Sequence, residues 1–173
     1  MSRLAKTKIK HNLNQLRLLY EEASRSISSE ANLHMTFYSK LALIEYCGWL
    51  EVSIDILVRR IIAKITDTDL IRIGERSVKS NYGFTYDDHF RVLLVKNLGL
   101  KNTEILLNKL RSSGDLALLE SKLNTFKTLR NEAAHNYFTG TSSYNSPSFY
   151  ISEVEAIFPI FKKIYTHFVQ HCG

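Results

Sequence analysis

Hydrophobic residues recur along this chain with the spacing of amphipathic α-helices. From about Leu4 to Ser28, polar residues separate an apolar set at positions i, i+3, i+7 and i+10, namely Leu13, Leu16, Tyr20 and Ala23. The longest periodic segment runs from about Asn32 to Ile65, and its stripe consists of Leu43, Cys47, Leu50, Ile54, Leu57, Ile61 and Ile65. We therefore predict two long helices, the second of them central to the core.

Polar residues and glycines divide the middle of the chain into shorter predicted helices. Asp67 or Thr68 is a suitable N-cap for a helix through about Lys79. A second short helix is expected over about 87–97, with Gly99 just beyond its C-terminal end, and a third over about 103–111.

The C-terminal part predicts two further long helices. The first is expected to follow Ser113-Gly114-Asp115 and to run to about Phe138, with a buried face made of Leu116, Leu119, Leu123, Phe126 and Ala133. After a polar loop at 139–148, a last helix follows, which Pro159 should either kink or begin. No strand pattern is present. The prediction is an all-α fold, a single domain over 1–173, built as an up-and-down bundle of four main helices with additional short ones.

Composition limits the class of protein. With 7 Gly and 2 Pro in 173 residues, an all-β sandwich is disfavoured, and 45% hydrophobic residues are typical of a globular domain. The net charge of +6 permits a polyanionic partner such as RNA. Two cysteines, no signal-like N-terminus and no apolar run of about 20 residues predict a cytoplasmic protein without a membrane span. We expect no cofactor and no metal site. The chain has no glycine-rich phosphate loop, so the sequence does not support a nucleotide-binding enzyme.

Two neighbouring residues in the longest segment suggest contact with another helix. Gly48 in the middle of a helix costs about 1 kcal/mol relative to Ala, which favours close approach by a second helix. Trp49 is expected to anchor the core or a dimer interface.

The densest group of chemically versatile side chains is the string Arg130-Asn131-Glu132-Ala133-Ala134-His135-Asn136-Tyr137. A guanidinium can bind two phosphoryl oxygens at once, and imidazole is the side chain whose unperturbed pKa lies near neutrality. On a helix, Asn131 and His135 share a face, whereas Arg130 and His135 differ by about 140° around the axis. One helix therefore does not direct both side chains at one point. Two copies packed about a two-fold axis could supply them to a shared cleft.

The string resembles the R-x4-6-H motif of the HEPN superfamily, a group of all-helical domains with a polar residue such as Asn directly after the Arg. Arg130, Asn131 and His135 match the three motif positions. The resemblance implies a metal-independent RNase, a toxin or phage-defence effector. In such an enzyme a ribose 2′-OH attacks the adjacent phosphate and leaves a 2′,3′-cyclic phosphate and a 5′-OH. His135 would act as general base or acid, Arg130 would neutralise phosphoryl charge, and Asn131 would orient the His or donate to a phosphate oxygen.

The longer string R-x4-H-x-Y resembles HEPN toxins that are paired with minimal nucleotidyltransferase antitoxins. In those pairs the tyrosine two residues after the His carries an AMP modification that silences the toxin, and Tyr137 occupies that position here. Other interpretations stay open. The motif residues could be an ordinary solvated helix face, Tyr137 an amphipathic residue at the edge of the core, and the chain a non-catalytic HEPN-like module that binds RNA or a partner protein.

Overall fold

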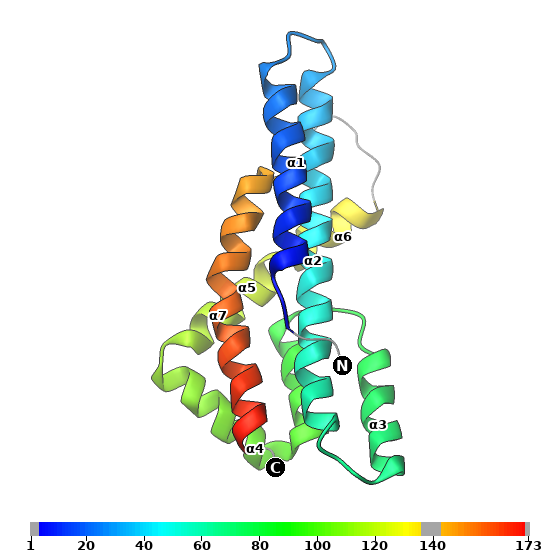
Figure 1. The fold of residues 1–173 in the computed structure, drawn as a ribbon, viewed down its shortest axis with the longest axis vertical. Helices are drawn as coiled ribbons and strands as arrows, with labels where there is room; N and C mark the ends of the chain where they lie inside the picture. The colour runs from blue at the N-terminus through cyan, green and yellow to red at the C-terminus, as the bar shows by residue number, and fades with distance from the viewer. Residues whose placement is uncertain (1–3, 136–142, 172–173) are drawn as a thin grey trace. The chain divides into compact units, whose positions relative to one another are not determined.

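The computed structural model describes residues 4–135 and 143–171, and every regular element within them is helical (Figure 1). The elements in chain order are α1 (Thr7–Arg25), α2 (Ala31–Ile62), α3 (Thr68–Lys79), a π-helical turn η1 (Tyr86–Phe90), α4 (Arg91–Ser112), α5 (Asp115–Thr125), α6 (Lys127–His135) and α7 (Pro147–His171). The predicted all-α class is confirmed. Among these helices, none has both the length and the apolar character that a membrane span requires.

Packing groups the chain into two compact units, and the long helices α2 and α7 each contribute to both. One unit contains Ala5–Trp49 and the described part of Phe126–Ala156, so it includes α1, α6 and the first parts of α2 and α7. We call it the α6 unit. The other, the α3–α5 unit, contains Leu50–Thr125 and the rest of α7.

In the α6 unit, polar contacts join α1 to its neighbours on two sides. The indole Nε1 of Trp49 on α2 donates to the carbonyl oxygen of Ala5, at 3.1 Å, just before α1 begins. On α7, the carboxylate of Glu155 forms an ion pair with the ammonium group of Lys6 and a second ion pair with Lys10, whose Nζ lies 2.6 Å from Oε1. Hydrogen bonds from these two ammonium groups hold the pKa of Glu155 below its ordinary value. The start of α1 is therefore tied to both α2 and α7.

In the α3–α5 unit, side chains define where two helices begin. Asp67 caps α3, because its carboxylate accepts from the backbone N–H groups of Asp69 and Leu70 at 2.9 Å. Asp115 begins α5 and accepts at Oδ2 from Lys163 of α7, 2.7 Å away, and from the Ser113 hydroxyl, 2.5 Å away. These two hydrogen bonds lower the pKa of Asp115.

Several sequence predictions are confirmed. The α2 stripe is buried from Leu43 to Ile61, and only Ile65, which lies beyond the helix, is half-exposed. Asp67 is the N-cap of α3 as expected. The predicted break at Gly99 is present inside α4, where this residue has φ 77° and ψ 165°, a conformation that glycine adopts without a Cβ clash.

The single helix predicted from about Asp115 to Phe138 is wrong. The structure has two helices, α5 and α6, separated at Phe126, and α6 is described as far as His135. The predicted end near Phe138 lies outside the described residues. No Gly or Pro marks the break, and the apolar spacing from Leu116 to Phe126 continues through it. The break is therefore a consequence of tertiary packing, since Phe126 belongs to an aromatic cluster described below. Pro159 also does not begin the last helix, because α7 starts at Pro147 and contains Pro159.

Candidate functional site

Aromatic packing anchors the start of α6, the helix that carries the motif residues. Phe126 immediately precedes α6, and its carbonyl oxygen accepts from the backbone N–H of Arg130 at 2.9 Å. The Phe126 ring is buried, with its centroid 5.2 Å from that of Tyr46 on α2 and 6.0 Å from that of Tyr150 on α7. Edge-to-face contacts of this kind are favourable beyond the area they bury. The cluster therefore fixes the first turn of α6 within its unit.

The two tyrosines of this cluster are not suited to proton transfer. Tyr46 and Tyr150 are fully buried, and burial is the largest cause that raises the pKa of each hydroxyl above its ordinary value. The carboxyl group of Glu153, which is also buried, raises both further. Both hydroxyls consequently stay protonated at physiological pH, and the cluster serves to position α6.

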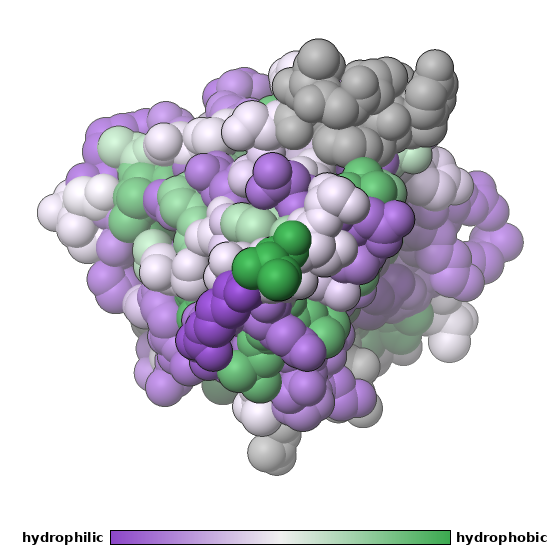
Figure 2. Space-filling view, turned by 90° about the horizontal axis from the view of Figure 1, so that it is seen from above, coloured by the Kyte–Doolittle hydropathy of each residue, from purple (hydrophilic) through white to green (hydrophobic). Residues whose placement is uncertain are grey.

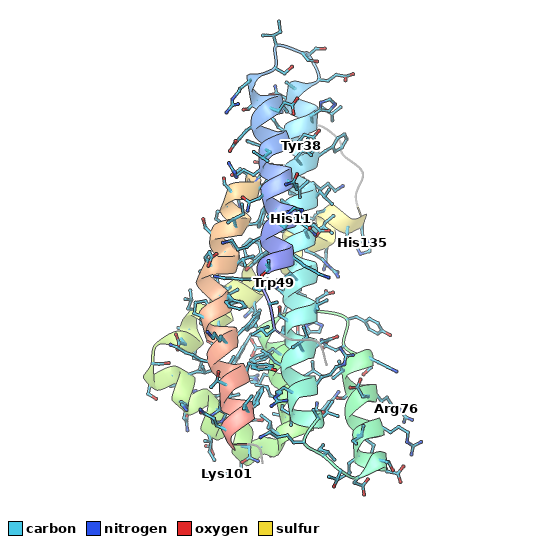
Figure 3. The ribbon with its side chains drawn as sticks, in the orientation of Figure 1. His11, Tyr38, Trp49, Arg76, Lys101 and His135 are labelled. Carbon is cyan, nitrogen blue, oxygen red and sulfur yellow. The ribbon has the colours of Figure 1, made fainter. Side chains whose placement is uncertain are left out.

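The motif residues divide between two sides of α6. Ala133 is the buried residue of this helix. Asn131 and His135 lie two positions before and after it, which places both about 160° from Ala133 around the axis. Both are accordingly exposed, whereas Arg130, about 60° from Ala133, is half-buried. Figure 3 shows His135 at the end of α6, level with the stretch of α2 between Tyr38 and Trp49.

A hydrogen bond connects the half-buried cation to the exposed face. Arg130 Nη1 donates to Asn131 Oδ1 at 3.2 Å. Because a guanidinium has no acceptor atom, this contact assigns the oxygen of the carboxamide to Arg130 and leaves the Nδ2 group as the donor that Asn131 can offer to a ligand. The contact also directs the guanidinium toward the side of α6 that carries His135.

The arrangement supplies a cation, an amide donor and an imidazole on a surface that solvent reaches. Efficient phosphoryl chemistry needs such groups to act where water is excluded and charges are not screened. On a single chain, the exposure of Asn131 and His135 does not meet that condition.

Among the described residues, no group of three or more His, Cys, Asp or Glu could hold a metal ion.

Tyr137, the predicted AMP-modification site, lies outside the described residues, as does Asn136. The role of Tyr137 therefore stays a prediction.

Two cavities were not anticipated from the sequence. In the α6 unit, a cavity of about 230 Å³ is lined by Tyr20, Asn32, Met35, Thr36, Ser39, Ser143 and Tyr144. The polar positions Asn32, Thr36 and Ser39, at i, i+4 and i+7, were the available signal. The cavity is smaller than the roughly 300–1,000 Å³ of ordinary ligand sites, so it does not suit a nucleotide.

The larger cavity belongs to the α3–α5 unit and has a volume of about 520 Å³. Leu106 and Leu110 give it an apolar wall, and Lys109, Lys162 and Lys163 line it with amines. The adjacent Lys162-Lys163 pair in the predicted last helix was the only hint in the sequence. None of the motif residues lines this cavity.

Comparison with protein-family models, with curated proteins and with solved structures finds no match to this chain.

Proposed function

We propose that this protein is a metal-independent endoribonuclease of the HEPN type, a cytoplasmic toxin or phage-defence effector whose fold is a HEPN-like four-helix bundle. One observation carries the proposal. Arg130, Asn131 and His135 occur together on the short helix α6, and Arg130 is hydrogen-bonded to Asn131 while Asn131 and His135 face solvent. The resemblance of the motif supplies the reaction class and the roles of its residues, and the exposure of Asn131 and His135 on α6 supports the proposal because both side chains can reach a ligand.

The proposed reaction is transesterification within RNA. The 2′-oxygen forms a bond to the neighbouring phosphorus and loses its proton to an imidazole. The bond from phosphorus to the 5′-oxygen breaks, and this oxygen takes a proton from an imidazole as it leaves. Arg130 bonds the phosphoryl oxygens, whose negative charge grows in the transition state, and Asn131 Nδ2 donates to one of them.

Each chain supplies half of this site. The reaction needs one imidazole as base and one as acid, or a single imidazole in both roles in turn, and a surface that excludes water. A second copy of the chain, related by a two-fold axis, would add its own His135 and cover the exposed side of α6. The homodimer is therefore part of the proposed function.

Cleavage of RNA in the presence of a chelator tests the proposal. His135→Ala and Arg130→Ala should each lower the rate by about 10²–10⁴-fold. His135 is exposed, so the free energy of unfolding of His135→Ala should stay within about 0.5 kcal/mol of the parent. Exposed residues of the same types on other helices provide matched controls, His11→Ala on α1 and Arg76→Ala on α3 (Figure 3). Equal cleavage by His135→Ala and His11→Ala would contradict the assignment.

The competing function is a non-catalytic module that binds RNA or a partner protein. The open, solvent-exposed position of Asn131 and His135 on one chain favours it. RNA binding without chelator-resistant cleavage, in a monomer, would be its signature.

A nucleotidyltransferase partner is a separate part of the proposal. Co-expression with such an enzyme should add the mass of one adenylate to Tyr137, as measured by peptide mass spectrometry. An unmodified Tyr137 would remove the antitoxin pairing and leave the RNase assignment in place.

A further inference from the structure

The helix α2 is apolar on two opposite sides. Its buried side carries the core stripe, including Leu43, Tyr46 and Leu50. On the other side, apolar residues remain exposed at Phe37 (44%), Leu41 (45%) and Ile44 (36%), followed by Gly48 and by Val52 (57%). The spacing of these positions, in steps of three or four, places them on one face. We call Phe37, Leu41, Ile44, Gly48 and Val52 the outer face of α2.

Single exposed apolar side chains are ordinary on protein surfaces. Figure 2 shows hydrophobic residues that are interspersed with hydrophilic ones on the face seen from above. The outer face of α2 differs, because its apolar residues follow one another over four turns of one helix. Contiguous exposed apolar residues of this kind commonly mark a contact with another molecule. Something outside this chain is therefore expected to cover the outer face.

Gly48 adds an independent indication. The sequence predicted close approach by another helix at this residue, yet a Cβ atom placed on Gly48 would meet no atom of the described residues within 4 Å. Its φ angle also does not require glycine, since positive φ angles among the described glycines occur at Gly99 and Gly114. The cost of glycine in the middle of a helix is thus not explained by the fold of one chain. Close packing by a second chain would explain it.

The pattern of the outer face matches itself in an antiparallel arrangement. A two-fold axis that sets Leu41 of one copy opposite Gly48 of the other fills the space beside the glycine with a leucine side chain. The same register sets Phe37 opposite Val52, so large residues meet small ones twice. A parallel arrangement would instead set Gly48 opposite Gly48 and leave a gap there.

Charges beside the outer face agree with this register. Lys40 and Glu51 both lie about 60–80° to the same side of the centre of the face. An antiparallel two-fold keeps that side common to both copies and reverses the order along the axis. Lys40 of one copy then lies within about 3 Å, measured along the axis, of Glu51 of the other. The two-fold repeats this pair, and opposite charges at such flanking positions select partner and orientation.

We propose that the outer face of α2 binds a second copy of this chain in an antiparallel, two-fold arrangement. The inference rests on the proposed function, because it names the surface through which two copies of the chain would join their half-sites. In Figure 3, His135 at the end of α6 lies between Tyr38 and Trp49 in height, which is the level of the proposed two-fold axis on α2. The two-fold would therefore set the two copies of α6 at the same level.

Sedimentation of purified variants tests the surface. The parent should be a dimer, and Ile44→Glu should raise the dimer dissociation constant by about 100-fold or more, because it buries an unpaired carboxylate in the interface. Leu41→Glu should act in the same way. Leu118→Glu on α5, at a leucine of similar exposure (40%), is the matched control and should leave the dimer intact. A monomeric parent, or a dimer that Ile44→Glu and Leu41→Glu leave unchanged, would overturn the proposal.

Disulfide cross-linking tests the orientation, in a background with Cys172→Ser. Ile44→Cys lies next to the proposed axis and should cross-link to its own copy on oxidation. Val52→Cys should do so only when it is mixed with Phe37→Cys. Efficient self-linkage of Val52→Cys would overturn the antiparallel register, since a parallel pair brings like residues together. RNA cleavage is measured separately, so a dimer without cleavage removes the proposed function alone. A dimer that cleaves RNA but that Ile44→Glu and Leu41→Glu leave unchanged removes the interface alone.

Discussion

Removing the Phe126 ring should destabilise the α6 unit strongly. The ring is 2% exposed and has aromatic neighbours on α2 and α7, at centroid distances of 5.2 Å from Tyr46 and 6.0 Å from Tyr150. Phe126→Ala therefore leaves a cavity inside a packed cluster, and such substitutions cost about 3–5 kcal/mol. That is a large part of the roughly 5–15 kcal/mol that stabilises an ordinary domain.

Urea unfolding followed by circular dichroism measures this loss, and hydrogen exchange reports where it acts. The backbone amide of Arg130, which donates to the carbonyl oxygen of Phe126, should exchange markedly faster in Phe126→Ala. Leu118→Ala on α5, at an exposed leucine, is the control and should cost less than about 1 kcal/mol. A loss below about 1 kcal/mol in Phe126→Ala, with unchanged exchange in α6, would refute the idea that Phe126 anchors this helix.

Two further substitutions test other contacts. Asp115→Asn should lower the free energy of unfolding by about 0.5–1 kcal/mol at pH 7, a modest amount because Lys163 is largely exposed. Since folding lowers the pKa of Asp115, its contribution is present above the ordinary carboxyl pKa of about 4 and is lost as the pH falls through the lowered value. The parent and Asp115→Asn should therefore converge in acid, and a difference that persists there would contradict the contact. Gly48→Ala should stabilise the isolated chain by up to about 1 kcal/mol, because the added methyl group meets no atom of the described part of the chain within 4 Å. The same substitution should weaken the dimer. A destabilised chain on chemical denaturation would show that Gly48 has a role within the fold.

Periodicity and capping predicted most of the helices. The buried stripe of α2 and the cap at Asp67 follow from local spacing and side-chain chemistry, which a single sequence contains. The break between α5 and α6 could not be predicted in this way. No helix-breaking residue is present at 126, and the interruption depends on Tyr46 and Tyr150, which are distant in sequence from Phe126.

The candidate site was predictable in composition but not in geometry. The helical spacing correctly placed Asn131 and His135 on one face, away from Arg130. The hydrogen bond from Arg130 to Asn131 depends on side-chain conformations that spacing alone does not determine. The apolar outer face of α2 was visible in the sequence as extra hydrophobic positions, yet only the structure shows that α1, α6 and α7 leave it exposed.

Mixing two inactive variants tests most directly the claim that each chain supplies half of the site. Arg130→Ala and His135→Ala are purified separately, then combined in equal amounts under conditions that allow subunits to exchange. In a composite site, a mixed dimer retains one intact Arg130 and one intact His135 in the shared cleft. Chelator-resistant RNA cleavage should therefore return in the mixture, to a substantial fraction of the parent rate. The claim is contradicted if the parent cleaves RNA and the mixture is shown to contain mixed dimers, but the mixture does not cleave RNA.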